Sequence, residues 1–173
     1  MAESEQLQLQ PAELQKWRFL VASPVLDSRH PRIRSIAWML WECSGGRPRA
    51  FAELAHCVAR DCVTYQRDTA RVGEEDIAGY TRTPTRNDAV DALQRGADDC
   101  DAKARLFVAL CLARGLRARM MPMGNRAGML QHVYAAVEVD GKWLPVETTL
   151  RRARIGDEPR SVPFEKGKKE WLR

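Results

Sequence analysis

The stretch HVYAAVEVDGKWLPVE, residues 132–147, decides the fold because it encodes a β-hairpin with two unlike faces. Asp140-Gly141 separates two runs that are rich in β-branched and aromatic residues, and this dipeptide is a preferred turn of two-residue hairpins. Counting outward from that turn places Glu147 opposite Tyr134 on the neighbouring strand. The sequence therefore predicts two antiparallel strands in a defined register.

The two faces of this hairpin carry different chemistry. Because paired residues share a face, His132 is expected opposite Thr149 and becomes a diagonal neighbour of Glu147, about 7–8 Å apart between backbones. The opposite face is uniformly apolar, with Val133, Ala135, Val137, Val139, Leu144 and Val146. We therefore expect one face to cover the core and the other to present a histidine beside a carboxylate.

A cysteine stands where another helix is expected to begin. Cys100 lies in GADDCDAKARLF, residues 96–107, where an acidic turn gives way to an amphipathic pattern. The N–H groups and dipole at a helix start favour a thiolate. Three aspartates flank the thiol and oppose that charge: Asp98, Asp99 and Asp101. The thiol therefore needs a base, and His132 oriented by Glu147 completes the arrangement of thiol acyl-transfer catalysis.

Helical periodicity predicts five helices, over about residues 11–22, 31–43, 49–65, 85–95 and 102–113. The first is expected to stop at Ser23-Pro24, because proline blocks continuation, and the last at Gly115. Residues 67–84 lack periodicity and predict a long surface loop. Other conspicuous side chains are interpreted as packing residues, namely Trp38, Trp41, Cys62, Cys111, Met120, Met121 and Met123.

Length and composition indicate one soluble globular domain, since 45% of the 173 residues are hydrophobic and 29% are charged. No apolar run reaches the ~18 residues of a membrane span. The opening MAESEQLQLQ lacks the pattern of a secretory signal. We therefore expect a cytoplasmic protein that keeps its five cysteines as thiols and has no membrane partner.

The net charge of +5 is concentrated in a basic C-terminal tail. Residues 151–173 hold eight Lys and Arg against four Asp and Glu, so the remainder of the chain is nearly neutral. We interpret the tail as a solvated segment, with a phosphate-binding arm as the alternative. Nucleic acid is therefore not the expected partner.

Three blocks of the chain together resemble the transglutaminase-like superfamily of cysteine proteins, especially its compact bacterial and phage members. They are D-D-C-D-A-K-A at 98–104, A-R-G-L at 113–116 and the hairpin stretch at 132–147. Weaker similarities are V-T-Y-Q-R-D at 63–68, Glu74-Glu75 and Pro84, and the resemblance covers about residues 55–150. It implies an α+β, papain-like fold in which the cysteine-bearing helix packs on an antiparallel sheet, together with a Cys-His-Asp triad.

The chain departs from the family pattern at three positions. Asp98 stands where members usually have glycine, Ala102 replaces an acidic residue, and Glu147 replaces the aspartate of the triad. A glutamate can still accept a hydrogen bond from the imidazole N–H. We therefore carry the triad over as Cys100, His132 and Glu147.

The resemblance implies a cysteine-dependent hydrolase, a peptidase or amidase, that works through an acyl-thioester on a peptide or protein substrate. The backbone N–H of Cys100 and one further donor would hold the oxyanion, and Tyr65 and Asp99 are the auxiliary candidates. No metal or other cofactor is called for. His56, Cys57 and Cys62 lack the second ligand pair of a zinc site.

Alternative functions remain open at this point. Amine transfer to glutamine, as in transglutaminases, is the nearest rival chemistry. A catalytically degenerate domain for binding or assembly, in a phage-related context, is a rival of another class. The expected organisation is a helical portion at 1–54 packed on the core, a catalytic core at 55–150 and the tail at 151–173.

Overall fold

The computed structural model describes residues 11–66, 88–124, 130–157 and Pro159, and it shows a mixed α+β fold. In chain order the elements are α1 (Pro11–Asp27), α2 (Pro31–Cys43), α3 (Pro48–Asp61), β1 (Thr64–Tyr65), α5 (Asp88–Arg95), β2 (Ala97–Asp98), α6 (Cys100–Ala113), β3 (Ala118–Gly124), β4 (Leu130–Val139) and β5 (Lys142–Val146). The expected loop at 67–84, with Glu74, Glu75 and Pro84, lies outside the described residues.

The predicted hairpin is confirmed in its turn and, as far as Ala135 opposite Val146, in its register. β4 and β5 pair antiparallel from Val139 opposite Lys142 to Ala135 opposite Val146. Asp140 and Gly141 have φ values of 52° and 72°, as a turn with two left-handed residues requires. β3 pairs with the other edge of β4, which completes a three-stranded antiparallel sheet in the order β3-β4-β5.

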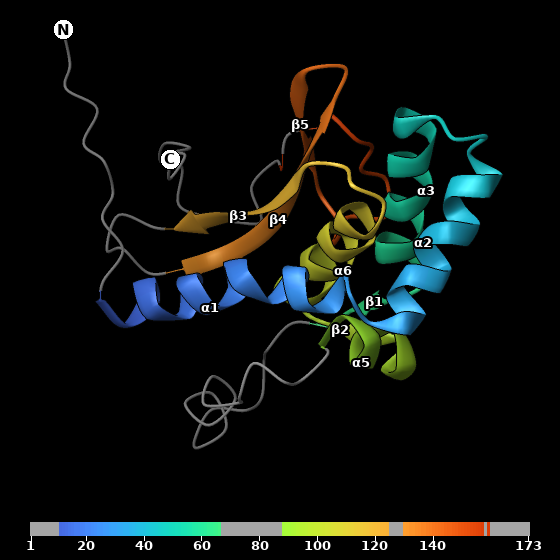
Figure 1. Cartoon of the computed structure of the whole chain (residues 1–173). Coiled ribbons are helices and arrows are strands. Elements are labelled where there is room, and N and C mark those ends of the chain that lie inside the picture. Colours follow the sequence, from blue (N-terminus) through green and yellow to red (C-terminus); the bar gives the residue numbers. More distant parts are fainter. Residues whose placement is uncertain (1–10, 67–87, 125–129, 158, 160–173) are drawn as a thin grey trace, which may run out of the picture.

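Helix α6, which begins at Cys100, lies at the centre of the fold. Figure 1 shows it among the other helices and beside the sheet, and it packs against β3 and β4 as well as α1, α2, α3 and α5. Every residue from Ala102 to Cys111 is buried. A helix that is enclosed all round in this way belongs to the core, so the position of Cys100 is set by the packing of the whole domain.

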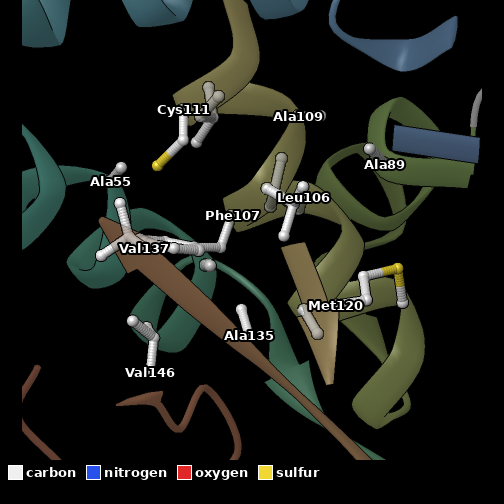
Figure 2. Packing of buried hydrophobic residues seen from close by; sticks show 14 of the residues in the cluster. Ala55, Ala89, Leu106, Phe107, Ala109, Cys111, Met120, Ala135, Val137 and Val146 are labelled. Atoms are coloured by element: carbon white, nitrogen blue, oxygen red, sulfur yellow. The ribbon is translucent and has the colours of Figure 1, made fainter. Parts of the chain in front are cut away.

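The apolar face of the hairpin is confirmed as part of the core. Val133, Ala135, Val137, Val139 and Val146 are buried, and Leu144 packs against them. Figure 2 shows Leu106 and Phe107 of α6 in the same cluster as Val137 of β4 and Val146 of β5. This face therefore covers the core as the alternation of the sequence predicts, while Tyr134 and Ala136 on the other face form a smaller buried cluster with Met121.

Helix α1 does not stop before Pro24, and that prediction was wrong. The helix continues through Pro24 to Asp27, although proline cannot donate the backbone hydrogen bond. Pro24 is buried, and the Asp27 carboxylate accepts from Arg105 Nε at 2.6 Å and from its Nη2 at 3.1 Å. Tertiary contacts thus hold a last turn that local sequence disfavours.

Helix α3 ends at Asp61, earlier than expected. Cys62 follows the helix and is exposed, so its interpretation as a core thiol was wrong. The end of α3 is set by Lys103 of α6, whose Nζ donates to the carbonyl oxygens of Ala59, at 2.8 Å, and Val63. The expected division of the chain after residue 54 stays a prediction, and α3 runs across it.

Most of the other side chains that were predicted to pack in the core are buried or partly buried, and one is exposed. Cys111, Met120 and Met121 are buried, and Met123 packs against the cluster that contains Met121, as expected. Trp41 stacks edge-on against Phe51, with ring centroids 5.7 Å apart. Trp38, in contrast, is 56% exposed and is not a core residue. Among the described residues, no helix is both long and apolar enough to cross a membrane.

Candidate active site

Cys100 is the first residue of α6, as predicted. Asp99 is the residue that caps this helix, and its Oδ1 accepts a hydrogen bond from the Ala102 N–H at 3.1 Å. The thiol is half-buried and packs against the core cluster. Cys100 therefore stands at the positive end of the helix dipole, in contrast to Cys111, where complete burial raises the thiol pKa and favours the inert form.

Two of the three aspartates near Cys100 contribute less negative charge around the thiol than the sequence implies. Asp98 forms an ion pair with Arg95. Burial, followed by the nearby charge of Asp101, raises the pKa of Asp99 to about 9, so its carboxyl holds a proton at neutral pH. The negative field expected to oppose a Cys100 thiolate is thereby reduced.

His132 and Glu147 meet directly in the structure. The His132 Nε2 lies 2.8 Å from the Glu147 Oε2, and the two residues are only 3% and 1% exposed. Burial raises the pKa of Glu147, but hydrogen bonds from His132 and Thr149 outweigh it and hold this pKa below its usual value. An ionised carboxylate only accepts, so Nε2 carries the ring proton and Nδ1 is the basic nitrogen of the neutral imidazole.

The second oxygen of Glu147 is held by Thr149. The backbone N–H and the Oγ1 of Thr149 both donate to the Glu147 Oε1, each at 2.7 Å. Both oxygens of the carboxylate are therefore held by hydrogen bonds. This restraint compensates for the extra rotatable bond that a glutamate has where the family pattern has aspartate.

Glu147 contacts His132, but it does so from outside the strand ladder in which the hairpin register would place it. The β4–β5 ladder ends at Ala135 opposite Val146, so Glu147 and Thr149 are not in the ladder. His132 instead pairs across the other edge of β4, with Met123. The predicted diagonal neighbours do make contact, but through their side chains after the chain has left the sheet.

Tyr65 lies close in the fold to the start of α6. Strand β1 pairs parallel with β2, which places Tyr65 opposite Asp98, and the Gln66 N–H donates to the Asp98 carbonyl oxygen at 2.9 Å. The Tyr65 side chain is exposed, at 39%. This pairing joins the strand after α3 to the turn that precedes Cys100.

Two buried residues near the site were not assigned to it from the sequence. His56 of α3 places its Nε2 at 2.7 Å from the Glu147 carbonyl oxygen. Lys103 lies three residues after Cys100, and its Nζ donates to the backbone carbonyl oxygens of Ala59, Arg60 and Val63. The available signal was the pair of cations Lys103 and Arg105 in the helical stretch AKARLFVAL, residues 102–110, whose other residues are all apolar. A cation buried in such a helix must find partners.

The arrangement of His132 and Glu147 suits general acid–base chemistry. No cluster of three His, Cys, Asp or Glu side chains that could hold a metal occurs in the part of the chain that the structure describes. His132 has one nitrogen on a buried carboxylate, and this geometry orients an imidazole to accept and return a proton.

Comparisons with known proteins identify the family. No curated protein matches the chain significantly. A crystal structure named "putative protease" from Parabacteroides distasonis is similar in fold, with a TM-score of 0.55 and 14% sequence identity. The match covers 77% of this chain and 26% of that chain, so this protein spans about a quarter of its length. The sequence model of the Transglutaminase-like superfamily matches residues 59–148, just over half of the chain, and the chain therefore belongs to that superfamily.

Proposed function

We propose that the protein is a cysteine-dependent hydrolase that cleaves amide bonds of peptides or proteins through an acyl-thioester. The observation that carries the proposal is the buried hydrogen bond between His132 Nε2 and Glu147 Oε2, at 2.8 Å. A histidine held in this way has a defined tautomer, which is what a general base for a thiol requires. The position of Cys100 at the start of α6 supplies the nucleophile.

In the first half-reaction, His132 Nδ1 accepts the proton of the Cys100 thiol. The Sγ forms a bond to the substrate carbonyl carbon, and the carbonyl oxygen becomes an oxyanion. The Cys100 backbone N–H and a further donor, for which Tyr65 is the candidate, stabilise this charge. The C–N bond then breaks as His132 returns the proton to the leaving amine, and an acyl-thioester remains on Cys100.

In the second half-reaction, water attacks the thioester carbonyl and gives a proton to His132. The C–S bond breaks, the thiolate recovers the proton, and a carboxylic acid leaves. Throughout, Glu147 stays ionised and stabilises the imidazolium that forms twice in the cycle. Asp99 acts at the start of α6, where its cap on the Ala102 N–H fixes the first turn that carries the nucleophile.

A peptide or protein substrate is supported by the family and by the name of the similar structure, which is that of a protease. The same acyl-thioester could be resolved by an amine, which would transfer the acyl group instead of hydrolysing it. Water and amine therefore compete for one intermediate, and a single experiment can separate them.

The proposal is tested by incubating the protein with unfolded casein in H₂¹⁸O, with and without a primary-amine probe, and analysing the products by mass spectrometry. Hydrolysis predicts new chain termini, or glutamates from side-chain amides, that carry ¹⁸O. The products should disappear in Cys100→Ala and persist in Cys43→Ala, since Cys43 is an exposed thiol at the end of α2.

The other outcomes contradict specific parts of the proposal. Cys100-dependent incorporation of the amine without ¹⁸O would show acyl transfer in place of hydrolysis. Absence of any product, combined with tight binding of a peptide by Cys100→Ala and by the parent alike, would show a binding domain.

A further inference from the structure

His56 links the acid of the proposed triad to the helix that carries the cysteine. Its imidazole is 3% exposed, and Nε2 lies 2.7 Å from the Glu147 carbonyl oxygen. The same ring meets Phe107 of α6 edge-on, with ring centroids 6.5 Å apart and planes at 90°. The His56 side chain thus contacts both Glu147 and Phe107, and Phe107 lies on α6 two helical turns after Cys100.

The contact determines which ring nitrogen of His56 carries a proton. A carbonyl oxygen only accepts, so His56 Nε2 must carry the proton and donate it. Burial lowers the pKa of His56, so the ring is neutral at physiological pH and donates without bringing a charge into the core. The hydrogen bond therefore persists over the neutral range.

Glu147 needs such a contact because the sheet no longer holds it. The ladder between β4 and β5 ends at Val146, one residue earlier, so the Glu147 carbonyl has no partner strand there. A buried carbonyl without a partner is costly, and a backbone free to rotate would move the carboxylate. The His56 contact fixes the backbone from which the side chain reaches His132.

We infer that His56 is a positioning residue: its hydrogen bond to the Glu147 backbone holds the carboxylate in place to orient His132. This inference deepens the proposed function and rests on it for its effect on Cys100, but the positioning of Glu147 can be measured separately. His56 does not touch the reacting atoms, so it acts only through Glu147.

A pair of amide variants tests the inference with matched chemistry. The glutamine of His56→Gln has its amide nitrogen near the position of Nε2 and can still donate to Glu147, whereas the shorter asparagine of His56→Asn cannot reach. Two quantities are measured in each protein: amide hydrogen exchange at Thr149, whose N–H binds the Glu147 Oε1, and alkylation of Cys100 at about pH 6.5. The amide of Leu106, in the core of α6, reports global opening.

In His56→Asn we expect exchange at Thr149 to become about tenfold faster, with Leu106 little changed, and Cys100 labelling to become about tenfold slower. His56→Gln should stay within about twofold of the parent on both readouts. If His56→Asn does not fold, His56→Leu, which keeps the volume and lacks the donor, takes its place.

The two readouts separate failure of the inference from failure of the function. Equal exchange at Thr149 in all variants would overturn the inference, whatever happens to Cys100. Faster exchange at Thr149 with unchanged labelling, in a parent whose labelling depends on His132, would also overturn it. If labelling of the parent is already slow and independent of His132, the proposed function fails, while the exchange data still decide whether His56 holds Glu147.

Discussion

Lys103 of helix α6 donates from its Nζ to the carbonyl oxygen of Ala59 in helix α3, at 2.8 Å, from a position with no exposed surface. The same ammonium also donates to Arg60 and Val63, so its three protons meet three carbonyl groups at the end of α3. Burial lowers the pKa of Lys103 to about 8, which leaves it charged at neutral pH. A cation at a helix C-terminus is favourable, so Lys103 fastens the cysteine helix to α3.

Replacing Lys103 by methionine should destabilise the fold. Met has a similar length and fills the space, but three carbonyl oxygens lose their donor, at a cost of about 2 kcal/mol in the free energy of unfolding. Urea unfolding followed by circular dichroism measures it. The control is Lys142→Met at the exposed first residue of β5, expected within about 0.5 kcal/mol of the parent. Equal stability of the two variants would show that Lys103 is not a structural clamp.

The buried ion pair between Asp27 and Arg105 should be more sensitive than an exposed one. Asp27→Asn leaves the Arg105 charge buried without its carboxylate, and we expect a loss of about 3 kcal/mol or more. The matched change Glu53→Gln, which breaks the exposed pair with Arg49, should cost about 0.5 kcal/mol or less. Thermal unfolding measures the loss of stability in each variant. Similar losses in the two variants would contradict a buried ion pair between α1 and α6.

Asp99 predicts a specific pH dependence of stability. Its folded pKa of about 9 exceeds the unfolded value, so the folded carboxyl keeps a proton that the unfolded chain releases. Its contribution to stability is complete below the unfolded pKa of about 4 and declines as the pH rises towards 9. Asp99→Asn does not titrate and keeps an oxygen that can cap Ala102. The variant should therefore gain stability relative to the parent between about pH 5 and pH 8, measured as the difference in thermal midpoints. A difference that is constant over this range would show that Asp99 is ionised in the fold.

Glu147→Gln should slow the reaction of Cys100 by about tenfold or more at pH 6.5, because the amide cannot stabilise the imidazolium of His132. Glu138→Gln provides the matched control. Glu138 lies on the same hairpin but pairs opposite Trp143, away from His132, and its substitution should leave the rate within about twofold. Equal rates in the parent and in Glu147→Gln would show that Glu147 is not part of the proposed triad.

The elements that the sequence predicts correctly are those with local causes. The hairpin follows from Asp140-Gly141, whose residues tolerate positive φ, and from strict alternation on either side. Helix α2 has the predicted bounds because proline begins it and two glycines follow it. Helix α6 ends before Gly115 for the same kind of reason.

The features that escape prediction depend on contacts between distant residues. The last turn of α1 exists because Asp27 meets Arg105, 78 residues away, and α3 ends early because Lys103 binds its terminal carbonyls. The protonation of Asp99 requires a degree of burial that spacing does not encode. The contact of His56 with Glu147 joins a helix to a strand end across 91 residues.

The coupling of Cys100 to His132 is measured by the rate of alkylation of each cysteine by iodoacetamide between about pH 5 and pH 9, in the parent and in His132→Ala. We expect selective, fast labelling of Cys100 below the ordinary thiol pKa of about 8.5, and we expect the variant to lose it, while exposed Cys43 and Cys62 label alike in both proteins. Slow labelling of Cys100 that does not depend on His132 would contradict a catalytic role for Cys100, because the thiol would then have no base.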